Sequence, residues 1–181
     1  MNPLLSIALA LGLAGLLFFA YRRIGTTYGL RGGLALIALV LLAVNPLYRM
    51  AAVGYLQVIA NQHPAIAANP YWDLYYTFTI FLTAAALVLS VYGGVGVLTG
   101  RRHSIVWRAL IALWVSGPLV NALYLFAAGQ VAALAAVPAP DFMLGMLPPL
   151  AISLLATAYL LTARQVRVVY AEAAEQETPS A

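Results

Sequence analysis

The stretch LYYTFTIFLTAAALVLSVYGGVGVL, residues 74–98, decides the fold class of this protein. It contains no charged side chain, and it is apolar on nearly all helical faces, which is typical of a helix in lipid. A helix rises about 1.5 Å per residue, so this stretch exceeds the length needed to cross a hydrocarbon core of about 30 Å. The stretch therefore predicts a transmembrane helix.

The composition of the whole chain agrees with this prediction. Of 181 residues, 64% are hydrophobic and only 8% are charged, and the mean hydropathy is +0.94. A soluble domain has about 45–50% apolar and about 25% charged residues. A chain of 19.2 kDa has too small a core to hide so much apolar surface. The rest must face lipid or partner proteins, so an ordinary soluble domain is excluded.

Four other apolar stretches have a similar character. We predict an all-α, polytopic transmembrane helical bundle in which residues 1–171 form a single domain. Its five spans are expected at about 4–21, 34–48 with a helical continuation to about 60, 74–98, 105–128 and 142–161. The polar tail 172–181 is expected to be disordered in the cytoplasm.

The first apolar stretch has two interpretations, a retained span or a cleaved signal peptide. A signal peptide has basic residues before its apolar run. Here no charged side chain precedes Leu4, whereas Arg22 and Arg23 follow the run. These flanks favour a retained helix with its N-terminus outside.

The arginines predict the orientation of the bundle, because cytoplasmic loops of membrane proteins are rich in basic residues. Arg49 is the only basic residue expected on the outer side. The other eight of the nine basic residues fall on the opposite side, and they are Arg22, Arg23, Arg31, Arg101, Arg102, Arg108, Arg164 and Arg167. The C-terminus is therefore expected in the cytoplasm, and the multi-pass protein in a bacterial inner membrane.

Composition also excludes several kinds of site. The chain has no cysteine, so disulfides, iron–sulfur clusters and Cys-type zinc sites are ruled out. His63 and His103 are far apart in sequence and are expected on opposite sides of the membrane. The net charge of +4 follows the helix ends rather than forming a basic face, so no nucleic-acid partner is expected. We predict no catalytic, cofactor-binding or metal-binding residue, and no cofactor.

Two outer acids have a structural interpretation. Asp73 and Asp141 directly precede the third and fifth spans. Aspartate is a good N-cap and complements the positive end of the helix dipole. Both are therefore predicted to cap helices.

Two spans contain a helix-breaking proline next to polar residues. Asn45–Pro46 lies in the outer part of the second span, and Ser116–Gly117–Pro118, followed by Asn121, lies in the middle of the fourth. Each proline removes a backbone donor, which for Pro118 frees the Trp114 carbonyl under α-helical spacing. Broken helices of this kind are either ordinary kinks held by interhelical hydrogen bonds or parts of a midplane substrate site. We favour the first interpretation.

A short internal repeat links the same two spans. Residues 35–39 and 109–113 both read ALIAL, and each is followed by an Xaa–Pro–Leu triplet. Alanine- and leucine-rich segments also match by chance, so a duplication is the less favoured explanation.

Arg49 is the basic residue that the orientation does not explain. It is not expected to lie unpaired in lipid, and Asp73, at the outer end of the next span, is its predicted partner. Such a pair is either a structural clamp or an anion-binding or gating pair, and we favour the clamp. Asn45, Arg49, Asp73 and Asn121 are accordingly the candidate polar or gating positions.

Several short motifs, in this order, resemble a family of small bacterial inner-membrane proteins known as domain of unknown function 2569. They are Gly29–Leu30–x–Gly32–Gly33, Asn45–Pro46–Leu47–Tyr48–Arg49, Pro70–x–Trp72, Arg101–Arg102, and Tyr159 to Arg164–x–x–Arg167–Val168. The resemblance covers about residues 27–171. It implies a multi-span inner-membrane protein, usually with four spans, so the helix at 4–21 would be an addition. It implies no activity and no catalytic residues.

The sequence leaves two functional interpretations open. The first is a non-enzymatic accessory or interaction subunit of a membrane assembly, whose partners are the lipid bilayer and other membrane-protein subunits or further copies of itself. The alternative is a small-solute transporter or channel with a site between the kinked second and fourth spans. The alternative predicts a polar cavity around Asn45 and Asn121. An enzyme is not expected, because the spans contain hydroxyl groups but neither histidine nor carboxylate.

Overall fold

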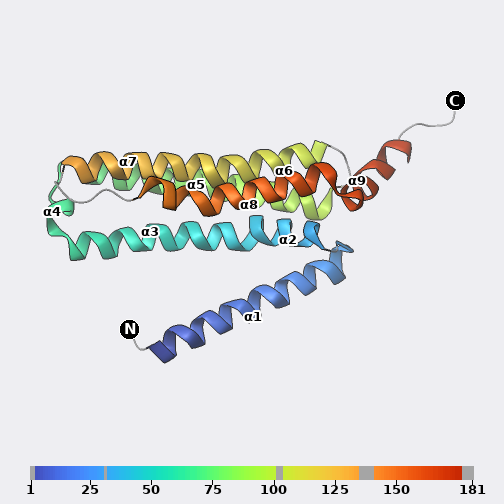
Figure 1. Cartoon of the computed structure of the whole chain (residues 1–181), viewed down its shortest axis with the longest axis horizontal. Coiled ribbons are helices and arrows are strands. Elements are labelled where there is room, and N and C mark those ends of the chain that lie inside the picture. The colour runs from blue at the N-terminus through green and yellow to red at the C-terminus, as the bar shows by residue number, and fades with distance from the viewer. Residues whose placement is uncertain (1–2, 31, 101–103, 135–140, 177–181) are drawn as a thin grey trace.

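The computed structural model describes residues 3–30, 32–100, 104–134 and 141–176 (Figure 1). Every regular element in these ranges is a helix, and no strand occurs in them, which confirms the all-helical fold class. Predicted features at Arg31, at residues 101–103 and in the tail from residue 177 lie outside the described residues.

Four helices in the described part of the chain are long and apolar enough to cross a membrane. They are Gly33–Gln62, Trp72–Thr99, Ser104–Ala132 and Phe142–Thr162. These helices correspond to the second to fifth predicted spans. The expected continuation of the second span to about residue 60 is confirmed, because no helix-breaking residue follows Pro46 until Pro64.

Two of the four helices are interrupted by a π-helical segment. The first consists of α2 (Gly33–Leu39), η1 (Val40–Val44) and α3 (Asn45–Gln62). The other consists of α6 (Ser104–Trp114), η2 (Val115–Leu119) and α7 (Val120–Leu134). The uninterrupted helices are α5 (Trp72–Thr99) and α8 (Phe142–Thr162).

Three further helices flank this bundle. α1 (Pro3–Tyr28) contacts α2 and α5 near its C-terminal end and diverges from the bundle toward its N-terminus (Figure 1). It is not among the four candidate spans found in the described residues, so a fifth span stays a prediction. α4 (Pro64–Ala67) is a short turn between α3 and α5. α9 (Arg164–Gln176) follows α8. It extends past residue 172, where the polar tail is predicted to begin.

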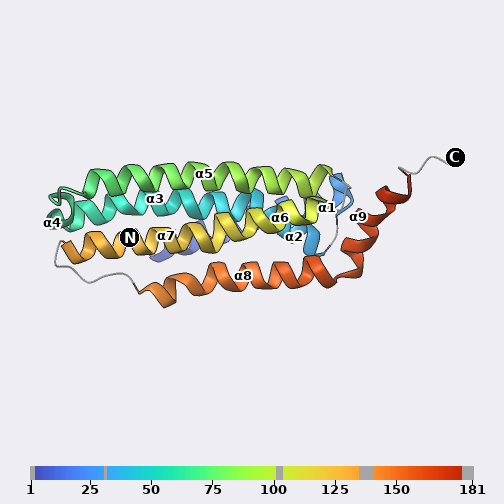
Figure 2. The ribbon, with the colours of Figure 1, turned by 90° about the horizontal axis from the view of Figure 1, so that it is seen from above.

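The two interrupted helices run in the same direction, and α5 and α8 run in the opposite direction (Figures 1 and 2). α5 packs against α2, η1 and α3, and it also packs against α6, η2 and α7. α8 packs against α6, η2 and α7 and touches α2. The middle of α5 is therefore in contact with both π-helical segments.

Two glycines of α5 allow this close packing. A Cβ atom on Gly93 would lie 2.4 Å from the Ala112 Cβ atom, and one on Gly94 would lie 2.5 Å from Leu42 Cγ. Small residues let membrane helices approach closely. Gly93 and Gly94 thus set the distance between α5 and the two interrupted helices.

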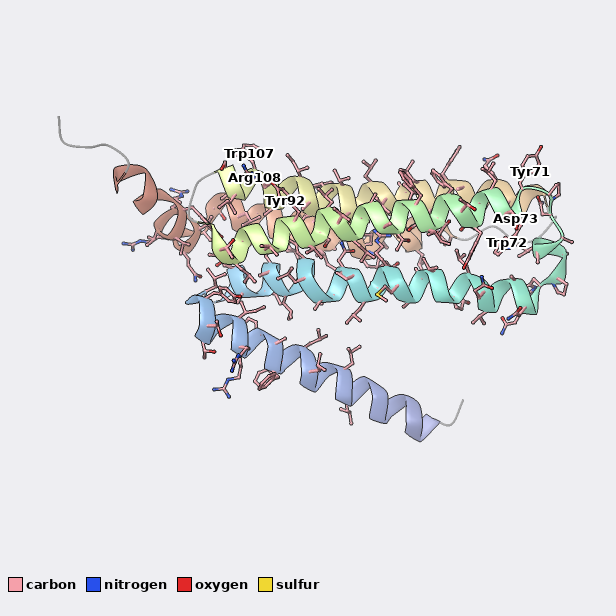
Figure 3. The ribbon with its side chains drawn as sticks, turned by 180° about the vertical axis from the view of Figure 1, so that it is seen from behind. Tyr71, Trp72, Asp73, Tyr92, Trp107 and Arg108 are labelled. Carbon is pink, nitrogen blue, oxygen red and sulfur yellow. The ribbon has the colours of Figure 1, made fainter. Side chains whose placement is uncertain are left out.

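The described arginines other than Arg49 lie at one end of the bundle. Trp107 and Arg108 lie at this end, with the guanidinium of Arg108 5.9 Å from the Tyr92 ring (Figure 3). The C-terminal end of α1 and the start of α9 carry the remaining four and lie at the same end (Figure 1). Tyr71, Trp72 and Asp73 lie at the opposite end (Figure 3). Aromatic residues at both ends and arginines at one are the arrangement expected of a helical membrane protein.

The two acids predicted as helix caps behave differently. Asp141 is the N-cap of α8, and its Oδ1 atom accepts a hydrogen bond of 3.0 Å from the Leu144 N–H, as predicted. Asp73 lies in the first turn of α5, whose N-cap is Tyr71. Asp73 is therefore near the positive end of the helix dipole without being the cap, which corrects that prediction.

Candidate functional site

The two π-helical segments lie in the middle of their helices and mark the candidate site. π turns inside α-helices are rare and are frequent at functional sites. Each lies beside a proline, since η2 contains Pro118 and Pro46 follows η1 by two residues. Proline has no N–H, so it weakens α-helical spacing at these positions. The kinks predicted from the prolines are therefore seen as π turns.

At η1 the change of spacing leaves one carbonyl without a backbone donor. The Asn45 N–H donates to the Val40 carbonyl, five residues back. The next residue, Pro46, has no N–H, so the Leu41 carbonyl is passed over and has no backbone donor at either four- or five-residue spacing. The hydroxyl of Ser90 on α5 donates to this Leu41 carbonyl at 2.6 Å. A neighbouring side chain thus satisfies the passed-over acceptor, as a buried carbonyl requires.

At η2 the same geometry recurs with a different donor. The Val120 N–H donates to the Val115 and Gly117 carbonyls, so the Ser116 carbonyl, its partner under four-residue spacing, is passed over. Arg49 Nη2 donates to the Ser116 carbonyl at 2.5 Å and to the Gly117 carbonyl at 2.9 Å. The side chain therefore binds at Ser116 and Gly117 and not at Trp114, the carbonyl predicted from α-helical spacing.

Asn45 joins the two π segments to α5. Its Nδ2 atom donates to Ser90 Oγ at 3.0 Å and to Ser116 Oγ at 2.8 Å. The Ser116 hydroxyl in turn donates to the Ala112 carbonyl at 2.5 Å. The predicted interhelical role of Asn45 is confirmed, and both hydrogens of its amide are used.

Arg49 is almost completely buried, with 1% of its surface exposed. Besides the two carbonyls, its Nη1 atom donates to Asn121 Oδ1 at 3.4 Å. Its guanidinium carbon lies 5.5 Å from the Tyr48 ring centroid and 5.4 Å from that of Tyr124, within cation–π range. A guanidinium has five N–H donors, and Arg49 Nε has no acceptor. Arg49 therefore retains unused hydrogen-bonding capacity.

The predicted pair of Arg49 with Asp73 is wrong. No ion pair joins the two residues, and every acceptor of Arg49 lies on η2 or α7. The Asn45–Ser90 bond shows why, since it places these two residues at the same level. From there Arg49 is about 6 Å further along α3, whereas Asp73 is about 26 Å further along α5 in the same direction. The carboxylate lies about 20 Å beyond the guanidinium.

Arg49 also lies deeper than the sequence predicts. It is about 24 Å from Gly33 and about 20 Å from Gln62 along one continuous helix. A hydrocarbon core of about 30 Å placed anywhere on this helix includes Arg49. The sequence predicts Arg49 at the outer interface because it places the outer end of the membrane-crossing part of the helix at Tyr48. The apolar residues after Arg49 are long enough, in one continuous helix, to extend that part beyond it.

Asn121 connects the site to α8. It is 5% exposed, and its Nδ2 atom donates to the Gly145 carbonyl at 2.7 Å. A second link to α8 is the Ser153 hydroxyl, which donates to the Leu113 carbonyl at 3.4 Å. Tyr124 reaches α5, where its hydroxyl donates to the Thr79 carbonyl at 3.0 Å and also contacts Thr83. All four candidate spans are therefore joined around Arg49.

Sequence reasoning missed the roles of Ser90, Tyr124 and Ser153. Ser90 and Ser153 are each the only serine within α5 and α8, and each is fully buried. An isolated serine in a long apolar span is a signal for an interhelical hydrogen bond. An isolated serine does not by itself identify its hydrogen-bond acceptor. The π-helical spacing in the neighbouring helix decides which carbonyls are passed over.

A cavity of about 140 Å³ lies between α3, η2 and α8. Its polar lining includes Asn45, Arg49, Ser116 and Ser153. Its other walls are mainly apolar, among them Val40, Val44, Leu113, Pro148, Pro149 and Ile152. The sequence predicts a polar cavity around both asparagines if the protein is a transporter or channel. The observed cavity is lined by Asn45 but not by Asn121, and most of its walls are apolar.

The arrangement thus places an arginine without a carboxylate partner in the middle of a candidate span, where it lines a cavity. No group of three or more acidic or histidine side chains able to hold a metal ion occurs in the described ranges. Chemically, the site can bind an anion or hold a fixed positive charge. No protein-family model, curated protein or solved structure matches this chain.

Proposed function

We propose that this multi-span membrane protein binds a small anion at Arg49 and belongs to the class of small-solute transporters or channels. The observation that carries the proposal is the position of Arg49, which is buried in the middle of a candidate span, lines a cavity and is held by neutral groups alone. Ionisable residues at membrane depth commonly mark substrate or ion pathways.

Electrostatics supports an anionic ligand. A charge in a medium of low dielectric constant is costly unless it is paired. The protein compensates Arg49 with carbonyl and amide dipoles and two tyrosine rings, which are neutral groups. An anion in the cavity would supply the missing opposite charge. Two interrupted helices meeting at midspan are also the setting in which transporter sites are built.

The proposal includes the finer topology. We place the chain in a bacterial inner membrane, with α1 as a fifth span, the N-terminus outside and the C-terminus in the cytoplasm. The five described arginines at one end of the bundle support this orientation. The protein is proposed to be non-enzymatic.

The test is equilibrium binding of acetate and chloride to the full chain in nanodiscs of zwitterionic lipid. Arg49→Gln keeps a side-chain donor for the Ser116 carbonyl but removes the charge. We expect anion affinity to fall at least about 30-fold, as for truncation of a buried charge pair. Arg108→Gln is the matched control, because Arg108 is an exposed arginine at the end of α6.

Binding by Arg49→Gln equal to that of the wild type would contradict the proposal. Transport is tested separately with proteoliposomes that carry the same three proteins. We expect flux of radiolabelled anion in the wild type and in Arg108→Gln, and none in Arg49→Gln. Arg49-dependent binding without flux would rule out the transporter and channel class and leave a binding protein.

The second candidate is the accessory or interaction subunit, and one observation favours it. The cavity opens sideways, because its lining residues Tyr48, Pro148 and Ile152 are exposed at midspan. A partner helix with a carboxylate at this depth would pair with Arg49 through the opening. Purification from native membranes in mild detergent tests this candidate, which predicts a co-purifying membrane protein that Arg49→Gln no longer retains.

A further inference from the structure

We infer that the anion bound at Arg49 is a monocarboxylate with an apolar body, which reaches the site from the bilayer between α3 and α8. This inference rests on the proposed function and specifies its ligand class and route. It follows from four features of the cavity: its donors, its charge, its shape and its opening.

Most of the polar side chains of the cavity already use their donors. Both Asn45 amide hydrogens are used, and the hydroxyls of Ser116 and Ser153 each donate to a carbonyl. Arg49 is the charged side chain of the lining, and its Nη1 atom has one acceptor for two hydrogens. Guanidinium and carboxylate are planar groups that match each other in geometry.

The charge of the site favours a monoanion. Arg49 is the single charged residue among those that line the cavity. A dianion such as hydrogen phosphate would carry a second negative charge into an apolar site without a partner, and an unpaired buried charge is strongly unfavourable. A singly charged carboxylate leaves the occupied site neutral.

The shape of the cavity favours an apolar body. A cavity of about 150 Å³ holds a benzene molecule, and the cavity at Arg49 has about 140 Å³. A second cavity of about 260 Å³ shares the lining residues Val40, Leu113 and Ile152 with the first. It is lined further on by Gly33, Leu36, Leu155 and Tyr159. Together the two provide an apolar path from Arg49 toward the start of α2, which suits an alkyl chain.

The opening favours a route through the bilayer. Several residues that line the two cavities are large, apolar and exposed on the surface of the candidate spans. They are Leu36, Tyr48, Ile152 and Leu155. On the opposite side of the same helices, Leu34, Ala38 and Leu41 are fully buried against the core. The site is thus accessible from the lipid side of α3 and α8, where an amphiphilic carboxylate partitions.

The test measures the affinity of the full chain in nanodiscs for straight-chain carboxylates from acetate to decanoate. Burial of each methylene is expected to strengthen binding about four-fold until the two cavities are filled. The matching straight-chain alcohols control for partitioning into lipid, and chloride and phosphate serve as inorganic probes. We expect the alcohols, chloride and phosphate to bind more weakly than the longer carboxylates. Arg49→Gln should remove the difference between carboxylate and alcohol, and Arg108→Gln should keep it.

A second variant tests the path of the chain. Leu155→Trp enlarges an exposed side chain that lines the second cavity but not the cavity at Arg49, so the fold should tolerate it. We expect octanoate affinity to fall at least ten-fold while acetate affinity stays within about two-fold. Equal loss for both ligands would contradict a chain that passes Leu155.

The outcomes separate this inference from the proposed function. If chloride, acetate and octanoate bind equally and all depend on Arg49, anion binding stands and the inference is overturned. If phosphate binds more tightly than any carboxylate, the inference is also overturned. If no anion distinguishes the wild type from Arg49→Gln, both fail.

Discussion

At η1 the passed-over carbonyl of Leu41 receives the neutral hydroxyl of Ser90, whereas at η2 that of Ser116 receives the guanidinium of Arg49. The two π turns have the same backbone problem, lie in parallel helices and contact the same helix α5. At the first turn a neutral serine hydroxyl satisfies the carbonyl, so no charge has to be buried. The cation at the second turn is therefore more than the backbone requires, which is the main reason for assigning function there.

The largest effect is expected where α5 holds both turns together. Gly93→Ala would place a Cβ atom 2.4 Å from the Ala112 Cβ atom, which belongs to a side chain that has no rotamer to change. We expect the free energy of unfolding to fall by about 3 kcal/mol, as for overpacking of a tight core. Thermal unfolding in detergent measures this. Gly54→Ala is the control, since no atom lies within 4 Å of the added carbon, and its unfolding temperature should not fall.

The next effect separates the two turns directly. Ser90→Ala leaves the Leu41 carbonyl without a donor and removes one acceptor of Asn45, so we expect a loss of about 1–3 kcal/mol in stability. Its anion affinity should match that of the wild type. Arg49→Gln should show the reverse, with weak anion binding and a smaller loss of stability. Equal effects of the two variants on both measurements would mean that the two turns have the same purely structural role.

A smaller effect is expected from restoring a backbone donor at η2. Pro118→Ala supplies an N–H that favours α-helical spacing and so removes the reason for passing over the Ser116 carbonyl. We expect the carbonyl to rotate away from Arg49 and anion affinity to fall about ten-fold, or about 1.4 kcal/mol. Pro46→Ala, beside the first turn, should change anion affinity by less than about two-fold. The prediction fails if the two prolines have the same effect on binding.

The smallest effect is expected at a long hydrogen bond between neutral groups of the site. Ser153 donates to the Leu113 carbonyl at 3.4 Å, near the limit for a hydrogen bond. Ser153→Ala should lower the free energy of unfolding by less than about 0.5 kcal/mol, because interhelical bonds in membranes average about 0.6 kcal/mol. A loss above about 2 kcal/mol would show that α8 is held mainly through this serine.

Particular residues show how far the sequence could predict the site. The sequence predicts the interhelical hydrogen bond of Asn45, because an amide beside a proline in an apolar span needs a partner. It also singles out Arg49, but it predicts the wrong depth and the wrong partner for this residue. Opposite charges on consecutive spans suggested an ion pair, whereas the pairing depends on the axial register of α3 against α5. That register is set by the close contacts at Gly93 and Gly94.

Hydropathy along the chain was enough to predict an all-helical protein with four helices long and apolar enough to cross a membrane. The sequence also determined the arginine-rich end of the bundle and the positions of the two prolines. These features follow from local hydropathy and backbone chemistry, which need no knowledge of neighbouring segments. The packing of the helices was needed to show that the prolines stand at π turns, that the Ser116 carbonyl faces Arg49, and that Arg49 lines a cavity. Those features depend on which carbonyls and side chains meet across helices, and hydropathy carries no information about that register.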